Sequence, residues 1–219
     1  MGDVIKMCGI AGSFQMHGGP VDRVRLRQMI GTIRYRGPDD VGIYSDGPVG
    51  LTHARLSIID LAGGHQPMSI AKDSIWMTFN GEIFNYIELR DELIAKGHRF
   101  TSSSDTEVLL HLYQEEGERC VERLNGQWAF AIWDAPRRKL FLSRDRFGVR
   151  PLYYTQVDGA FLFASEIKAL LACPEVPCSI DLTGLDQLFT FWATIPPRTV
   201  FRGIRQLSPG HSLIVQDGH

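Results

Sequence analysis

The order of strand-like and helix-like segments constrains the fold of this chain more than any other feature of its sequence. Strand-like segments cover residues 8–14, where small and apolar residues alternate, 51–59 and 75–79, which are rich in β-branched and aromatic residues, and 127–133, 140–144, 152–155 and 161–164. Segments with helical spacing of apolar residues cover residues 23–33, 85–96, 104–113 and 181–192. Strands toward both ends, with the clearest helices between them, predict an α+β fold of layered sheets with helices packed outside.

Local signals support several of these boundaries. Gly97 ends the helix over 85–96, and Ser104 followed by Glu107 has the pattern of a capping box at the start of the next helix. The segment between Trp133 and Leu140 contains turn residues and predicts a hairpin. The Asp-Gly pair at 217–218 predicts a returning strand, so we expect this chain to be a piece of a longer protein.

Composition excludes several classes of function. The chain has 219 residues, 23 Lys and Arg against 25 Asp and Glu, and a net charge of -2, which gives no electrostatic case for nucleic acid or an anionic membrane as partner. No apolar run approaches the ~18 residues of a membrane span, and the N-terminus lacks a signal-peptide core, so we expect a cytoplasmic protein. The four cysteines show neither CxxC pairing nor zinc spacing, which predicts free thiols and no metal site. Three of them, Cys120, Cys173 and Cys178, are interpreted as small buried hydrophobes.

The fourth cysteine, Cys8, directly follows Met7. If translation starts at Met7 and this methionine is removed, one residue carries both a thiol, with pKa about 8.5, and an α-amine, with pKa about 7.7–8.0. Such a pair suits proton transfer near neutral pH, and an N-terminal nucleophile can use its own amine as base. From local composition alone, a buried strand residue remains the simpler interpretation of Cys8.

Eight motifs decide between these interpretations. They are MCGIAG at 7–12, RGPDD at 36–40, HARLSIIDL at 53–61, FNGEIFN at 79–85, SDTEV at 104–108, WAFAIWD at 128–134, RDRFGVRPLYY at 144–154 and FASEIKALL at 163–171. In this order and spacing, the chain resembles the glutamine-hydrolysing domain of the asparagine synthetases, a class II glutamine amidotransferase of the N-terminal-nucleophile hydrolase type. The resemblance implies a four-layer αββα sandwich of two mainly antiparallel sheets over residues 8–215.

The same resemblance implies a site for L-glutamine. Cys8 would be the nucleophile, with Asn80 and Gly81 as the oxyanion hole, although Asn-Gly is by itself a common turn. Arg55 suits the α-carboxylate, and Asp105 with Glu82 suits the α-ammonium; a surface ion pair and a favourable helix N-terminus are the respective alternatives. The segment expected to line the pocket, mainly through its main chain, comprises Leu56, Ser57, Ile58 and Ile59.

Two features depart from the family pattern. The segment MGDVIK precedes Met7, and we interpret residues 1–7 as an N-terminal extension or a mis-assigned start. The synthetase half, with its SGG-x-DS loop, does not occur in this sequence, so ATP and Mg²⁺ are expected only in a missing partner domain in cis. The smaller departures, Tyr35 in place of the usual His and Phe84 in place of the common Tyr, look tolerable.

These departures leave alternatives open. The domain could donate ammonia to another acceptor, as in the purine or amino-sugar amidotransferases, or bind glutamine silently as a regulatory domain. A homodimer also stays open. The aromatic run Phe189, Phe191 and Trp192 is expected in the core or at a domain interface, and His53 is expected to be a structural residue.

Overall fold

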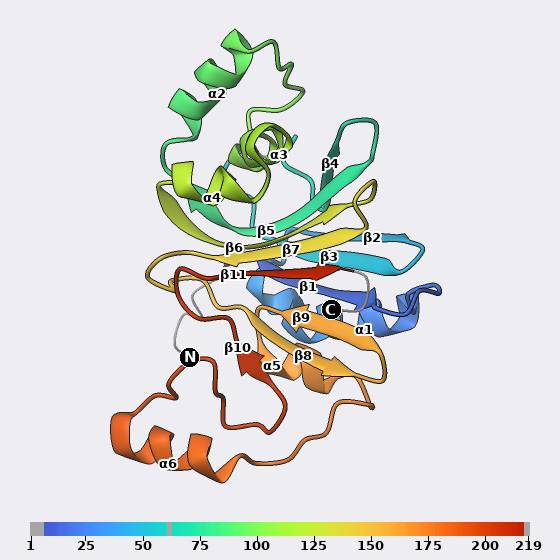
Figure 1. The fold of residues 1–219 in the computed structure, drawn as a ribbon, viewed down its shortest axis with the longest axis vertical. Helices are drawn as coiled ribbons and strands as arrows, with labels where there is room; N and C mark the ends of the chain where they lie inside the picture. Colours follow the sequence, from blue (N-terminus) through green and yellow to red (C-terminus); the bar gives the residue numbers. More distant parts are fainter. Residues whose placement is uncertain (1–6, 61–62, 217–219) are drawn as a thin grey trace.

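Two antiparallel β-sheets stacked face to face form the centre of the computed structural model, which describes residues 7–60 and 63–216 (Figure 1). The first sheet has six strands in the order β10-β8-β9-β1-β3-β2. They are β1 (Gly9–Gln15), β2 (Asp40–Asp46), β3 (Val49–Arg55), β8 (Tyr153–Val157), β9 (Ala160–Ala164) and β10 (Arg205–Gln206). The second sheet, in the order β11-β7-β6-β5-β4, comprises β4 (Met68–Ile70), β5 (Ile75–Ile83), β6 (Gly126–Asp134), β7 (Lys139–Arg144) and β11 (Ser212–Gln216).

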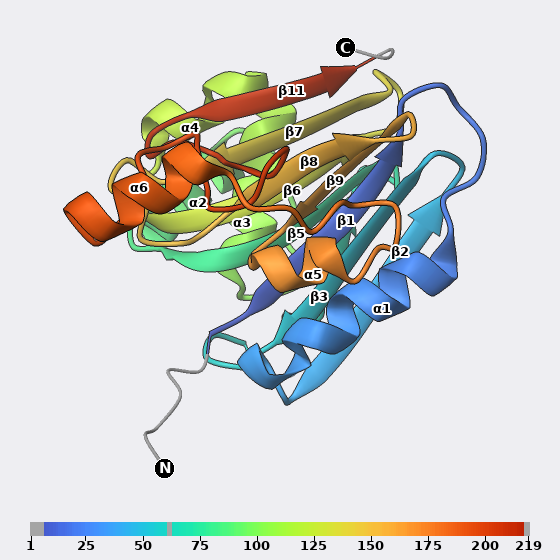
Figure 2. The same cartoon turned by 90° about the horizontal axis from the view of Figure 1, so that it is seen from below.

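Helices cover the outer face of each sheet. The five-stranded sheet is covered by α2 (Tyr86–Ala95), α3 (Asp105–Glu116) and α4 (Cys120–Arg123) (Figure 1). The six-stranded sheet is covered by α1 (Arg23–Ile33) and α5 (Ile167–Leu171), as Figure 2 shows, and α6 (Leu182–Phe191) lies at one end of the molecule. This arrangement confirms the α+β fold and the αββα order of layers.

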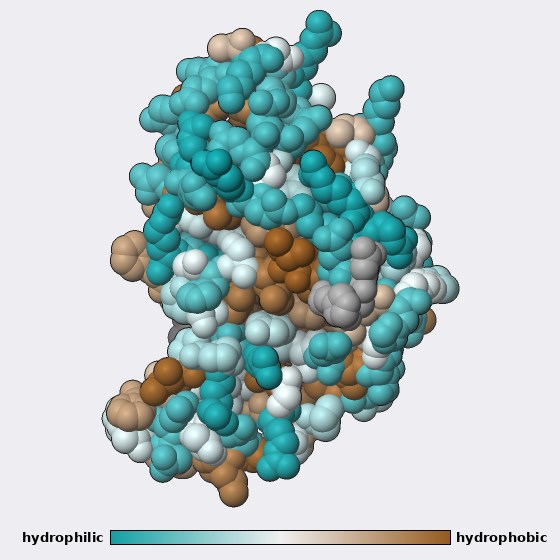
Figure 3. Space-filling model, viewed as in Figure 1, coloured by the Kyte–Doolittle hydropathy of each residue, from teal (hydrophilic) through white to brown (hydrophobic). Residues whose placement is uncertain are grey.

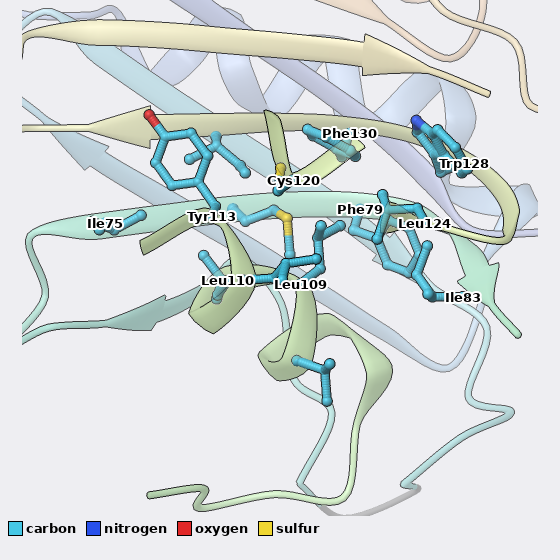
Figure 4. Packing of buried hydrophobic residues seen from close by; sticks show 14 of the residues in the cluster. Ile75, Phe79, Ile83, Leu109, Leu110, Tyr113, Cys120, Leu124, Trp128 and Phe130 are labelled. Carbon is cyan, nitrogen blue, oxygen red and sulfur yellow. The ribbon is translucent and has the colours of Figure 1, made fainter. Parts of the chain in front are cut away.

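Apolar side chains fill the three spaces between the four layers. Beneath the helices of the five-stranded sheet, Leu109 of α3 packs with Phe79 of β5 in one buried cluster (Figure 4). Between the sheets, the rings of Phe14 and Trp133 lie 5.3 Å apart, centroid to centroid. On the far side, Ile33 of α1 is fully buried against the six-stranded sheet. Because both faces of each sheet are covered, most residues of the central strands β1, β3 and β6 are buried.

The local signals are confirmed in part. Trp133 pairs with Leu140 in the β6–β7 hairpin. The Ser104 side chain caps α3 by accepting a hydrogen bond from the Thr106 N–H, but Glu107 does not complete the capping box. Its carboxylate instead accepts hydrogen bonds from the backbone and hydroxyl groups of the preceding loop, at Thr101 and Ser102. The Asp-Gly pair at 217–218 lies outside the described residues.

One predicted strand is too long. The segment 51–59 is a strand only as far as Arg55, because the guanidinium of Arg55 donates hydrogen bonds to the carbonyls of Ile59 and Asp60 and so holds the chain in a turn. The remaining predicted strands and helices are present with small shifts at their ends. The elements β2, β4, β10, α4 and α5 were not expected, because they are short or carry polar residues that blur the pattern.

Apolar side chains also lie on the surface around α6. Phe189, Phe191 and Trp192 are exposed, which excludes the core position that was one of the two expectations for them. Figure 3 shows apolar residues over this end of the molecule, where Figure 1 places α6. Cys120 and Cys173 are buried as expected, whereas Cys178 is exposed, so its interpretation as a buried hydrophobe was wrong.

Candidate active site

A pocket forms where the start of β1 meets the end of β3. These strands are antiparallel, and Gly9 pairs with Ala54, so Cys8 and Arg55 lie at the same edge of the sheet. The second sheet contributes Gly81 of β5, and the N-terminus of α3 contributes Asp105. The pocket is partly open to solvent.

Cys8 is half-buried beside the backbone of Leu56. The Leu56 N–H donates a hydrogen bond to the Cys8 sulfur over 3.3 Å, and the sulfur lies 3.6 Å from the Leu56 carbonyl oxygen. The Arg36 Nε donates to the Cys8 carbonyl oxygen over 3.0 Å and so fixes its main chain. Burial raises the pKa of the Cys8 thiol, while the Leu56 N–H and the nearby guanidinium groups oppose this rise. The thiol is therefore neutral at rest and needs a base to become a nucleophile.

Arg55 brings a buried guanidinium to the wall of the pocket. Its Nη2 donates hydrogen bonds to the carbonyl oxygens of Ile59 and Asp60, at 3.2 Å and 2.5 Å. Gly64 lies so close that a Cβ built there would sit 2.3 Å from this nitrogen. The loop after β3 therefore wraps around Arg55 and sets its orientation before any ligand arrives.

Asn80 and Gly81 are neighbours near the end of β5. Asn80 is 1% exposed, and its Nδ2 has no hydrogen-bond partner among the residues that the structure describes. Strand alternation points its side chain to the same face as that of Thr78, whose hydroxyl donates to the Thr52 carbonyl of β3. That face is the one turned toward the sheet of Cys8. A buried amide donor without an acceptor is costly, and it is a ready hydrogen-bond donor for a substrate oxygen.

Asp105 supplies negative charge to the lining of the pocket. Its carboxylate accepts a hydrogen bond from the Ile83 N–H over 3.0 Å. Burial raises the pKa of Asp105 to about 6, and the nearby charge of Glu82 acts in the same direction. The carboxyl group is thus ionised at neutral pH but destabilised by its surroundings, and a bound cation would relieve that cost.

Most of the predicted site residues line this pocket. They are Cys8, Arg55, Leu56, Ile58, Ile59, Gly81, Glu82 and Asp105. Ser57 does not line it; its N–H donates to Asp39 instead. Asn80 also lies outside the lining, directly beside Gly81 on the buried side of the strand.

Sequence reasoning missed other residues of the pocket. Gln66 accepts a hydrogen bond from the Phe79 N–H and donates to the Thr106 hydroxyl, and so ties β5 to α3. Arg150 lines the pocket near Cys8, although its motif, RDRFGVRPLYY, predicted no role for it. The RGPDD motif likewise predicted no role for Arg36, which lies outside the pocket lining but holds the Cys8 main chain. A lone Gln in a loop gives no sequence signal. Arg36 and Arg150, in contrast, lie within two of the eight motifs, RGPDD and RDRFGVRPLYY.

His53 supports the strand beneath the pocket. Its Nε2 lies 3.0 Å from the Phe79 carbonyl oxygen, and burial lowers its pKa to about 4. A neutral, fully buried imidazole fits the predicted structural role. Over residues 7–60 and 63–216, no group of three or more His, Cys, Asp or Glu side chains could hold a metal ion. No helix in the described part of the chain is long and apolar enough to cross a membrane.

Comparison with known proteins now adds to this geometry. Residues 7–219 match the family described as "Glutamine amidotransferase domain". The chain belongs to this family. The glutamine amidotransferase domain is 44% identical to "Asparagine synthetase [glutamine-hydrolyzing] 3" of Bacillus subtilis, with 94% of this chain and 34% of that protein aligned. It is 37% identical to "Amidase chyE" of Penicillium rubens, with 95% of this chain and 32% of that protein aligned.

The domain spans about a third of the length of these curated relatives. Solved structures share its fold. The "allosteric regulatory enzyme of purine biosynthesis" superposes with a TM-score of 0.68 at 23% identity, over 96% of this chain and 47% of that one. The glutamine phosphoribosylpyrophosphate amidotransferase of Bacillus subtilis gives a TM-score of 0.65 at 22% identity, with the same coverage. These likenesses establish the two-sheet fold of an amidotransferase.

Proposed function

We propose that this domain hydrolyses L-glutamine to L-glutamate and ammonia through a thioester on Cys8. The observation that carries the proposal is the meeting of four kinds of group around one pocket. A half-buried thiol, a guanidinium and a buried carboxylate line the pocket, and the free amide donor of Asn80 lies directly beside the lining residue Gly81. Each has a counterpart in glutamine, whose α-carboxylate, α-ammonium and side-chain amide require a cation, an anion and a nucleophile with an oxyanion donor.

The charged residues of the pocket match the charged groups of glutamine. The planar guanidinium of Arg55 suits the α-carboxylate, because its fork of N–H donors matches the two carboxylate oxygens. Asp105 and Glu82 line the same pocket and suit the α-ammonium. With the α-carboxylate and the α-ammonium both held, the side-chain amide of glutamine points toward Cys8.

The reaction then uses the N-terminal residue twice. The free α-amine of Cys8 takes the thiol proton as the sulfur attacks the amide carbon. The Asn80 Nδ2 and the backbone N–H of Gly81 stabilise the oxyanion of the tetrahedral intermediate. The amine returns the proton to the departing nitrogen, so ammonia leaves and a γ-glutamyl thioester remains. Water, activated by the same amine, hydrolyses the thioester to glutamate and restores the thiol.

The fate of the ammonia is the finer part of the proposal. In an asparagine synthetase, a synthetase half in cis would use ATP and Mg²⁺ to activate aspartate, and the ammonia would then form asparagine. The relatives carry two different names, synthetase and amidase, so another acceptor is a specific alternative. A cytoplasmic location, with neither nucleic acid nor membrane as partner, is also part of this proposal.

The test compares two forms of the same protein. One form begins at Cys8, and the other retains Met7 before Cys8; Cys8→Ala is the matched control. We expect ammonia release, and labelling of Cys8 by an electrophilic glutamine analogue, only in the form that begins at Cys8. Equal ammonia release from the form that retains Met7, or from Cys8→Ala, would overturn the proposal and favour a silent glutamine-binding domain.

A further inference from the structure

Arg150 is a cation of the pocket that the reaction above does not use. It lines the same pocket as Cys8, and its Nη1 contacts the sulfur of Met7, the residue joined to the nitrogen of Cys8. Its Nε is buried and has no hydrogen-bond partner within the described residues. A half-buried guanidinium with an unused donor, placed beside the terminal residue, indicates a role toward that residue.

A rigid turn holds Arg150 in this place. The fully buried carboxylate of Asp145 accepts hydrogen bonds from the N–H groups of Phe147, Val149 and Arg150, each over 3.0 Å. The Arg144 Nε donates to the Arg150 carbonyl over 2.7 Å. Both backbone groups of Arg150 are thus fixed by buried charged side chains, and Asp145 is a positioning residue in this arrangement.

The charges around Cys8 are unequal in their availability. Three guanidinium groups, from Arg55, Arg150 and Arg36, lie near enough to oppose the rise in the Cys8 pKa. Arg36 forms an ion pair with Glu166 over 2.8 Å, and Arg55 donates hydrogen bonds to the carbonyls of Ile59 and Asp60. Arg150 forms no ion pair with a carboxylate in the described part of the chain. Its positive charge is therefore the least compensated of the three near Cys8.

Several charged groups near Arg150 affect its own pKa. Burial lowers the pKa of Arg150, and the charge of Arg36 acts in the same direction, whereas Cys8, Asp145 and Glu82 oppose it. Arginine nevertheless stays protonated at every pH at which the enzyme would work. The cation next to Cys8 is therefore present at every working pH.

We propose that Arg150 keeps the α-amine of Cys8 unprotonated near neutral pH, so that this amine can act as the base. The inference rests on the proposed function. A neighbouring cation disfavours a second positive charge, which lowers the pKa of the amine below its usual 7.7–8.0. The same charge stabilises the thiolate as the proton moves from sulfur to nitrogen. Both effects favour the active pair, neutral amine and incipient thiolate.

The experiment compares Arg150→Gln with Arg150→Lys in protein that begins at Cys8. Arg146→Gln is the matched control, because Arg146 lies in the same turn, is exposed, and donates to the Leu124 carbonyl away from the pocket. The readouts are the pH dependence of kcat/KM for glutamine and the rate of alkylation of Cys8 by iodoacetamide. We expect Arg150→Gln to move the acidic limb up by about one pH unit and to slow alkylation at pH 7 roughly tenfold.

Arg150→Lys keeps the charge and should restore both profiles, and Arg146→Gln should match the wild type. Profiles of Arg150→Gln that superimpose on the wild type would overturn the inference. So would an equal loss in the Gln and Lys variants at every pH, since that outcome indicates a purely structural role. If thermal denaturation shows that Arg150→Gln is unfolded, Arg150→Met, which keeps an aliphatic stem without the charge, replaces it. A wild type that binds but never hydrolyses glutamine would refute the proposed function instead, while the alkylation profiles would still test Arg150.

Discussion

Replacing Asp105 with asparagine separates the stability of this domain from its affinity for glutamine. Asp105 is 5% exposed, and burial raises its pKa from 3.8 to about 6. A difference of about two pKa units corresponds to about 3 kcal/mol, by which the folded state is destabilised when the carboxyl group is ionised. Asparagine removes the charge but keeps an oxygen that can accept the hydrogen bond from the Ile83 N–H.

The direction in which stability changes with pH follows from which state, folded or unfolded, holds the Asp105 proton. Between pH 3.8 and about 6 the folded protein keeps the Asp105 proton while the unfolded chain has lost it. Stability therefore falls as pH rises through this window, and the full destabilisation is present above pH 6. Asp105→Asn should be more stable than the wild type by about 3 kcal/mol at pH 8 and by only about 1 kcal/mol at pH 4.5.

Urea unfolding at both pH values measures this difference, and Asp105→Ala is the control. The alanine variant leaves the Ile83 N–H without its acceptor and should be less stable than Asp105→Asn at both pH values. The Asn variant also loses the proposed partner of the α-ammonium, so its KM for glutamine should rise roughly 10- to 100-fold. A gain in stability that is equal at both pH values, or no gain at pH 8, would refute the reasoning.

Three further substitutions test single groups of the site. Asn80→Ala should lower kcat roughly 10²- to 10³-fold with little change in KM, because its amide acts on the oxyanion; a rise in KM alone in steady-state assays would contradict this. Arg55→Lys should raise KM for glutamine more than it lowers kcat, since lysine lacks the planar fork, and an unchanged KM would argue against the carboxylate assignment. Gly81→Ala should lower the melting temperature measured by calorimetry, because its Cβ would lie 2.2 Å from the Gln127 carbonyl oxygen; an unchanged melting temperature would show that this strand pair yields without strain.

The local patterns of the sequence determined the fold class and most of the elements. Strand alternation and helical spacing act over a few residues, so 23–33 is a helix as predicted and Trp133 pairs with Leu140. The linear motifs identified the family, because their order and spacing can be recognised without knowledge of the fold. The residues at the centre of the site, Cys8, Gly81 and Asp105, were therefore available from the sequence.

What tertiary structure decided are the contacts between segments far apart in the chain. The apolar residues after Arg55 predicted that β3 continues to Ile59. The strand ends at Arg55 instead, because the Arg55 guanidinium donates hydrogen bonds to the carbonyls of Ile59 and Asp60 and holds the chain in a turn. Gln66 joins β5 to α3, and Arg150 lines the same pocket as Cys8, 142 positions away, because the two sheets stack. Such partners depend on how layers pack, and no short-range pattern encodes them.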